Sequence, residues 1–399
     1  MRVNIARKSI DEYKNIVGNE KISEIKEKTK GMKGLKVLHF NSTSFGGGGA
    51  EMLHSLVPLM KDIGIDAEWK VMDAEDDFFE VTKTIHNGLQ GMEVDLTEKM
   101  KKIYLETNKK NSDLGDYDIF IIHDPQPVAV IKFKERGKWV WRCHIDTSKS
   151  NRKFVEFLKP YISEYDASIF TIKEFGNNIY DGKRFYIAPS IDPLSEKNRN
   201  LKEKDIENVL SKYKIDMDIP IITQVSRFDP WKDPMGVIEA YRYVKKKIPS
   251  QLILIGSMAN DDPEGLYYYK KIKKYAKNER DIILLTNLDD AEVNAFQRAS
   301  DIVVQKSLRE GFGLTVTEAM WKEKPVVATK VGGIPLQIED GKNGFLVGNT
   351  RECAEKIIYL LKNKEKAEEI GEKARKTVKD KFLITRHILD YLRLMEELM

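Results

Sequence analysis

The 399-residue sequence predicts an α/β protein built from two doubly wound parallel sheets in tandem. Short apolar runs typical of buried strands alternate with helix-length segments, which is the pattern of strand–helix–strand units. The alternation occurs in residues 35–171 and again in residues 219–347, with a charged connector between the two series. Open sheets of this kind bind ligands at the carboxyl ends of their strands. We therefore expect two Rossmann-like domains that face a ligand-binding cleft.

The first series follows an N-terminal extension, residues 1–33, in which apolar residues recur at helical spacing. The extension is expected to form one or two amphipathic helices, and its apolar face suits the interface of a homodimer. Strands are then predicted at residues 35–40, 69–72, 119–123, 139–144 and 168–171. A glycine-rich loop, residues 46–49, leads from the first strand into a helix at residues 50–63. The first domain is therefore placed at residues 34–193.

The second series predicts strands at residues 219–225, 252–255, 282–285, 302–304, 326–328 and 345–347. Helices are expected between them at residues 234–247, 291–299 and 315–323, and residues 350–399 are helical by period. The second domain is accordingly placed at residues 194–380.

Composition excludes several classes of function. The net charge is only +4 and no long basic block occurs, so nucleic acid is a poor partner. The two cysteines, Cys143 and Cys353, are too few for a disulfide framework or a four-thiolate zinc site. No apolar stretch of about 18 residues could span a membrane, and the N-terminus lacks a signal peptide's apolar segment. The expected location is the cytoplasm, and the high content of Lys and Glu is typical of heat-adapted proteins.

The glycine-rich loop is the first candidate site. Because it follows a strand and opens a helix, its free backbone N–H groups can meet an anion or a sugar, and Gly48 and Gly49 are the predicted contacts. No Gly-Lys-Ser/Thr follows, which argues against a P-loop NTPase. Glu51 stands where a dinucleotide fingerprint has its last glycine, so a nicotinamide dehydrogenase is a weak alternative.

Two loops of the second series carry charges suited to a nucleotide sugar. Arg227 and Lys232 follow the first strand and could hold a diphosphate between two cations. Glu310 and Glu318 flank the start of a helix whose N–H groups would point at a ligand, and each carboxylate could bind a separate pair of hydroxyls. A capping arrangement with dipole-favoured glutamates explains the same spacing, so the spacing alone leaves the question open.

Polar residues also close two strands of the first series. His144 ends one strand, and the pair His123-Asp124 ends another. A lone histidine is more often structural than functional. Asp216 and Asp218 form an Asp-x-Asp pattern, but they lie in a connector before a strand and indicate a solvated turn rather than a metal site.

Taken together, these residues resemble a known family. Residues 221–346 resemble the nucleotide-binding domain of retaining glycosyltransferases of family 4, which have the GT-B fold. The resemblance rests on the Glu310/Glu318 pair with seven residues between, the Gly-Phe-Gly loop, the Arg227/Lys232 pair and the segment Gly332-Gly333-Ile334-Pro335. With the glycine-rich loop and His144 it extends over roughly residues 35–395. The segments 225–234 and 144–146 are most similar to those of enzymes that make or phosphorolyse trehalose.

The resemblance implies a role for each matching residue. Arg227 and Lys232 would hold the donor diphosphate, and His144 would lie beside the anomeric carbon of the donor sugar. Glu310 would bind that sugar, Glu318 the ribose, and Gly48, Gly49 and Asp124 would face the acceptor. The implied donor-binding set is Gly311, Phe312, Gly313, Leu314, Thr315 and Glu318. The last helix, residues 381–399, would complete the first domain. Two departures from the family pattern are Glu323 in place of a glycine and Leu336 in place of a glutamate.

The expected function is a retaining glucosyltransferase that makes trehalose reversibly from a nucleoside-diphosphate glucose and glucose. UDP-, ADP- and GDP-glucose are equal candidates for the donor. No cofactor is required, since two cations and a helix dipole can stabilise the leaving group, and Mg²⁺ is compatible but called for by no motif. The alternatives are a trehalose phosphorylase, a family 4 enzyme with a different acceptor, and a non-catalytic sugar-nucleotide-binding regulator. The expected partners are small molecules and a second copy of the chain.

Overall fold

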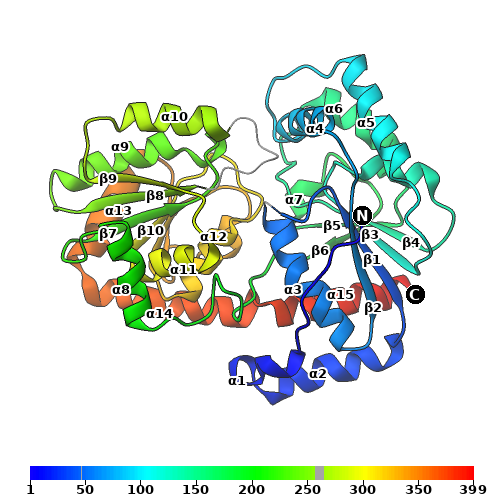
Figure 1. The fold of residues 1–399 in the computed structure, drawn as a ribbon, viewed down its shortest axis with the longest axis horizontal. Coiled ribbons are helices and arrows are strands. Elements are labelled where there is room, and N and C mark those ends of the chain that lie inside the picture. Colours follow the sequence, from blue (N-terminus) through cyan, green and yellow to red (C-terminus); the bar gives the residue numbers. More distant parts are fainter. Residues whose placement is uncertain (46, 257–264) are drawn as a thin grey trace. The chain divides into compact units, whose positions relative to one another are not determined.

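The computed structural model describes residues 1–45, 47–256 and 265–399. The chain divides into two compact units, shown in Figure 1. Unit 1 contains Met1–Ser190 together with Ile384–Met399, and unit 2 contains Ile191–Leu383. Of the glycine-rich loop, Gly46 lies outside the described residues.

Unit 1 is built on a six-stranded parallel sheet with the order β2-β1-β3-β4-β5-β6. Its strands are β1 (Lys36–Asn41), β2 (Asp66–Val71), β3 (Ile119–His123), β4 (Lys138–Arg142), β5 (Ala167–Phe170) and β6 (Lys183–Tyr186). Strands β1, β3 and β4 are neighbours, so the residues that follow them meet at one edge of the sheet.

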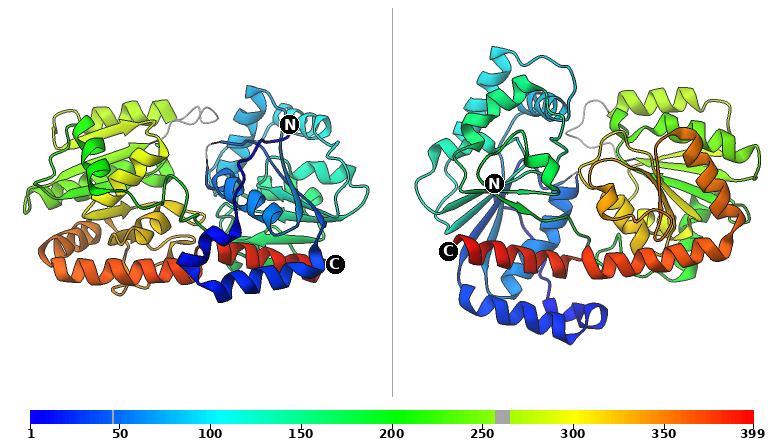
Figure 2. Two further views of the ribbon diagram at one scale, coloured as in Figure 1. Left: turned by 60° about the horizontal axis from the view of Figure 1, so that its bottom comes forward. Right: turned by 180° about the vertical axis from the view of Figure 1, so that it is seen from behind.

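Helices cover both faces of this sheet. One face packs against α2 (Asn19–Thr29), α3 (Gly48–Asp62) and α15 (Ile384–Leu398), whose apolar residues join one core with Val37, Ile121 and Val140. The opposite face packs against α4 (Asp76–Leu89), α5 (Glu98–Lys110) and α6 (Arg152–Ile162). The C-terminal helix is therefore part of unit 1, and it lies beside α2 (Figure 2).

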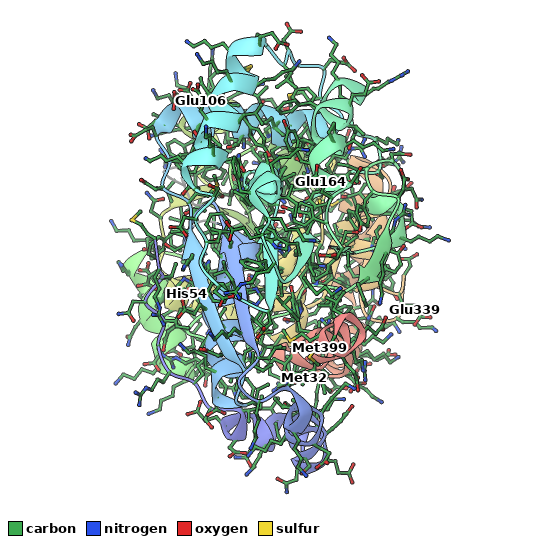
Figure 3. The ribbon with its side chains drawn as sticks, turned by 90° about the vertical axis from the view of Figure 1, so that its right-hand side faces the viewer. Met32, His54, Glu106, Glu164, Glu339 and Met399 are labelled. Atoms are coloured by element: carbon green, nitrogen blue, oxygen red, sulfur yellow. The ribbon has the colours of Figure 1, made fainter. Side chains whose placement is uncertain are left out.

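The N-terminal extension folds as η1 (Ile10–Tyr13), α1 (Lys14–Val17), α2 and η2 (Lys30–Met32). Its apolar residues Ile10, Tyr13, Ile22 and Ile25 are almost fully buried in the core of unit 1. Lys28 forms an ion pair with Glu396 of α15, and Figure 3 shows Met32 and Met399 at the same end of this unit. The apolar face from which a homodimer was expected is thus covered within the unit itself, and the homodimer stays a prediction.

Unit 2 is built on a second six-stranded parallel sheet, with the order β12-β11-β10-β7-β8-β9. Its strands are β7 (Ile221–Val225), β8 (Gln251–Gly256), β9 (Ile282–Thr286), β10 (Ile302–Gln305), β11 (Val326–Thr329) and β12 (Phe345–Val347). Its longer helices are α8 (Glu203–Lys212), α9 (Pro234–Lys245), α10 (Gly265–Tyr275), α11 (Asp290–Ala299), α12 (Leu314–Trp321), α13 (Thr350–Lys362) and α14 (Lys364–Lys381). Strands β7 and β10 are neighbours, which brings the two candidate donor loops to one edge.

The predicted fold class is confirmed, because both sheets are parallel throughout and helices accompany each of them. Strand β6 was not predicted. Its sequence, Lys-Arg-Phe-Tyr, is half charged, and no residue of this edge strand is buried. Such a strand lacks the apolar signal on which the prediction depends. Within the described ranges, no helix is long and apolar enough to cross a membrane.

Candidate functional site

The predicted residues of unit 1 gather where β1, β3 and β4 end. Helix α3 begins at Gly48, and a Cβ atom on Gly49 would lie 3.7 Å from the Nε2 and Cδ2 atoms of His144 and 3.8 Å from Oδ2 of Asp124. The start of α3 therefore lies against His144 and Asp124. A larger side chain at Gly49 would cover both groups.

Asp124 connects the ends of β3 and β4. Its backbone adopts the left-handed conformation with φ 64°, which aspartate tolerates better than most residues. Its N–H donates to the carbonyl of Arg142 at 2.8 Å, and its Oδ1 accepts from the backbone N–H of His144 at 2.9 Å. Burial raises the pKa of the Asp124 carboxyl to about 6, although the His144 N–H and the charge of Arg142 act in the opposite direction. The group can therefore hold or release a proton near neutral pH.

A chain of three histidines links β1, β3 and the loop after β4, in which His144 is the second residue. His39 Nδ1 lies 3.0 Å from His123 Nε2, and His123 Nδ1 lies 3.1 Å from His144 Nε2. His39 and His123 are 0% and 3% exposed. Sequence reasoning named His123 only as the end of a strand and missed His39. A signal for both was available in the sequence. Each histidine occupies a position in an apolar strand where an apolar residue is expected on the buried face, which marks a buried polar side chain.

Arg142, the last residue of β4, lies on the same face of the sheet as these histidines. It is 0% exposed, and none of its guanidinium nitrogens has a hydrogen-bond partner among the described residues. Burial lowers the pKa of Arg142, and the nearby His387 of α15 is held neutral because burial and the charges of Arg386 and Arg142 lower its pKa. Sequence reasoning missed both residues.

In unit 2, two of the predicted residues form a direct ion pair. Lys232 Nζ donates to Oε2 of Glu310 at 2.6 Å, and their side chains are only 16% and 9% exposed. The same carboxylate oxygen accepts from Ser307 Oγ at 3.1 Å and from Gln305 Nε2 at 3.3 Å. Sequence reasoning assigned Lys232 to the diphosphate and Glu310 to the sugar. Their contact brings the two predicted residues together.

Arg227 follows β7 and lies beside a second buried carboxylate. Its guanidinium lies 3.4 Å from the buried carboxylate of Asp229, and its side chain is 35% exposed. Asp229 also caps the short helix η4 (Pro230–Lys232) by accepting from the N–H of Lys232 at 3.1 Å. One carboxylate thus positions the loop that carries both cations.

The glycine-rich segment before α12 has the backbone geometry that the sequence predicts for a ligand-facing loop. Gly313 caps α12 in the left-handed conformation with φ 86°, so the free N–H groups of Leu314 and Thr315 begin the helix. A Cβ on Gly332 would lie 1.6 Å from the carbonyl oxygen of Glu310, so the segment after β11 packs tightly on this loop. Phe312 is 4% exposed and its side chain packs against Phe382, so its ring is not presented to a ligand.

Glu318 lies in a different environment from Glu310. It is on the first turns of α12, is 1% exposed, and accepts from Gln297 Nε2 of α11 at 3.1 Å. The two glutamates therefore differ in their partners, as separate roles require.

These groups suit the stabilisation of negative charge on a leaving group. Two cations and the N-terminus of α12 lie on one unit, and they can act without a metal ion. Within residues 1–45, 47–256 and 265–399, no group of three or more His, Cys, Asp or Glu side chains is arranged to hold a metal ion. Unit 1 supplies the neutral His144 ring and the Asp124 carboxyl, hydrogen-bonding groups that suit sugar hydroxyls.

Comparison with known proteins agrees with this division. Residues 39–177 match the family described as trehalose synthase, N-terminal domain, and residues 205–377 match glycosyl transferases group 1. A solved trehalose-6-phosphate synthase, OtsA, superposes with a TM-score of 0.74 at 13% identity, covering 91% of this chain and 99% of that one. The Anabaena protein Alr3699/HepE in complex with UDP-glucose gives a TM-score of 0.69 at 17% identity, covering 91% and 100%. The fold and the site therefore define a glycosyltransferase of the GT-B type.

Relatives in sequence specify the family further. The trehalose synthase of Pyrococcus horikoshii is 52% identical over 98% of this chain and 97% of its own length. The trehalose phosphorylase of Grifola frondosa is only 28% identical, over 93% of this chain and 58% of its own length. The chain belongs to the trehalose synthase family.

Proposed function

We propose that this protein is a retaining glucosyltransferase that forms trehalose from a nucleoside-diphosphate glucose and glucose. The observation that carries the proposal is the identity of 52% to a trehalose synthase over nearly the whole of both chains. The cation pair of Arg227 and Lys232 and the buried glutamates Glu310 and Glu318 support it, since together they supply contacts for a diphosphate, a sugar and a ribose.

In the proposed reaction, the bond between the anomeric carbon and the β-phosphate oxygen breaks as the acceptor hydroxyl attacks from the same face. The departing phosphate oxygen takes the acceptor's proton, so the products are trehalose and a nucleoside diphosphate. Lys232, Arg227 and the N–H groups of Leu314 and Thr315 stabilise the charge that develops on the diphosphate. No side chain is needed as a nucleophile, unlike the carboxylate pair of a retaining glycosidase.

The remaining roles are those that the family resemblance implies, and the surroundings of each residue are compatible with them. Glu310, fixed by Lys232, accepts hydrogen bonds from the donor sugar, and Glu318 binds the ribose. His144 contacts the donor sugar, whereas Gly48, Gly49 and Asp124 bind the acceptor glucose. The donor is a nucleoside-diphosphate glucose. UDP-glucose is one candidate, since the Anabaena protein of the same fold is described in complex with it, and ADP- and GDP-glucose are the others.

The test is product analysis with UDP-, ADP- and GDP-glucose, each combined with glucose. The expected product is α,α-trehalose, whose anomeric protons in an NMR spectrum report retention of configuration. Glucose 6-phosphate as acceptor tests a different acceptor, and trehalose with inorganic phosphate tests phosphorolysis. Product in either of those assays, with none from glucose and a sugar nucleotide, would contradict the proposal. Binding of sugar nucleotides without turnover would instead support the regulator. Light scattering on the same preparation tests the homodimer.

A further inference from the structure

The three histidines of unit 1 form a hydrogen-bonded series in which each ring constrains the next. The two N···N distances, 3.0 Å for His39–His123 and 3.1 Å for His123–His144, each require one proton between the paired nitrogens. The rings of His123 and His144 lie nearly parallel, at an interplanar angle of 8°. The three rings are therefore coupled, and the nitrogen that carries the proton in one ring determines which nitrogen carries it in the next.

All three rings are neutral near pH 7. Burial lowers the pKa of His39 to about 3. Burial is the first cause that lowers the pKa values of His123 and His144 well below the usual value for histidine. The neighbouring rings of His39 and His144 and then the charge of Arg142 add to it for His123, and the charge of Arg142 adds to it for His144. Each neutral ring carries one proton. With one proton on each ring and one in each contact, only two arrangements remain: all three protons on Nδ1, or all three on Nε2.

The far end of the series distinguishes the two arrangements. Nε2 of His39 is buried and has no hydrogen-bond partner among the described residues. With all protons on Nε2, His39 would carry a buried N–H group without an acceptor, which is rare in folded proteins. With all protons on Nδ1, the same atom is an unused lone pair, for which the cost is smaller.

We propose that His39 and His123 are positioning residues that hold His144 in the tautomer with its proton on Nδ1 and its Nε2 accepting from His123. The assignment to catalysis rests on the proposed function, in which His144 contacts the donor sugar. In this tautomer His144 offers a sugar an N–H donor at Nδ1, and its Nε2 is already occupied. His144 is then a neutral hydrogen-bond donor and not a base that acts through Nε2.

The direct test is long-range ¹H–¹⁵N correlation NMR at pH 7 on the full chain labelled with ¹⁵N-histidine. Only six histidines are present, so His→Asn variants can assign each ring. The expected spectrum shows protonated Nδ1 and unprotonated Nε2 for His39, His123 and His144. A proton on Nε2 of His144, or an imidazolium in any of the three rings, overturns the proposal. Because the protein is measured without substrate, this result stands whatever reaction the enzyme catalyses.

Kinetics test the role in transfer. His39→Asn retains a polar group at the position of Nδ1, whereas His39→Phe removes it, so Phe is expected to lower kcat about tenfold and Asn about threefold or less. The dissociation constant for nucleoside diphosphate should not change in either variant, because the proposed nucleotide-binding residues belong to unit 2. His86→Asn, on α4, is the matched control with unchanged kcat. Equal kcat for the wild type and a folded His39→Phe variant overturns the positioning role, and the wild-type NMR spectrum decides the tautomer if that variant fails to fold.

Discussion

The ion pair between Lys232 and Glu310 can be tested as a double-mutant cycle with Lys232→Met, Glu310→Gln and the combination. Its distance of 2.6 Å and its burial suggest that breaking it is costly. Removing one partner of a buried pair typically costs 3–5 kcal/mol, because the other charge remains without compensation. In the Lys232→Met variant, Glu310 would keep Ser307 and Gln305 as neutral donors, each with a net value of about 1 kcal/mol.

We therefore expect Lys232→Met to lower the free energy of unfolding by about 2–3 kcal/mol. Glu310→Gln should cost about 1–2 kcal/mol, since the Lys232 ammonium is 16% exposed and can recruit water. The double variant, which leaves no buried charge at this point, should cost about 2 kcal/mol, so the coupling energy should be about 2 kcal/mol. Turnover should fall about 10²-fold or more in Lys232→Met, because a group that stabilises the leaving diphosphate is lost.

The measurement is native-state hydrogen exchange by mass spectrometry on the amides of β7 and β10, which reports unit 2 separately from unit 1. The matched control is the exposed pair Lys342–Glu339, whose side chains are each 66% exposed. The coupling in that cycle should stay below about 0.5 kcal/mol. Equal coupling energies in the two cycles would refute the reasoning, since burial would then not determine the strength of the Lys232–Glu310 pair.

Two further predictions separate the roles of other buried groups. Glu318→Ala should weaken binding of free nucleoside diphosphate, whereas Glu310→Ala should spare it and abolish most transfer; equal losses in calorimetry would mean that the two carboxylates are wrongly assigned. Acidification from pH 7 to 5.5 should lower the free energy of unfolding of unit 1 by about 4 kcal/mol. His39, His123, His144 and His387 are neutral when folded and take up protons with pKa near 6.5 only when unfolded, at about 1.2 kcal/mol each. Folded Asp124, with its pKa raised to about 6, takes up a proton over the same range and offsets about 0.8 kcal/mol of that loss. Urea unfolding at the two pH values measures this loss, and a loss below about 1 kcal/mol would mean that the folded protein already binds these protons.

The fold was predictable from sequence where burial leaves a strong signal. Strands such as β3 (Ile119–His123) and β8 (Gln251–Gly256) are buried along their whole length, and they read as continuous apolar runs. Strand β6 carries the opposite signal, because Lys183 is exposed and Arg184 is only half-buried at the edge of the sheet. Periodicity reports burial, so a strand without a buried residue escapes it.

The residues of the candidate site could be named from the sequence one by one, and their roles stay predictions, but their contacts could not be predicted. Lys232 and Glu310 are 78 residues apart, and they meet because β7 and β10 are neighbours in the sheet. The order of strands is a tertiary property that no local pattern encodes. His39 illustrates the same limit: it opposes Ile121 of β3, and the pleat then brings it within 3.0 Å of His123, two residues further along.

Two largely buried cations, Lys232 in unit 2 and Arg142 in unit 1, differ in their partners. In unit 2 the cation of Lys232 is matched by the carboxylate of Glu310. In unit 1 the cation of Arg142 is buried without a hydrogen-bond partner among the described residues, an arrangement that costs stability by itself. The same positive charge lowers the pKa of His123, His144 and His387 and so disfavours an imidazolium in each ring. One unpaired arginine two residues before His144 therefore contributes to keeping the histidine series neutral, which is the state that a fixed hydrogen-bond donor to a sugar requires.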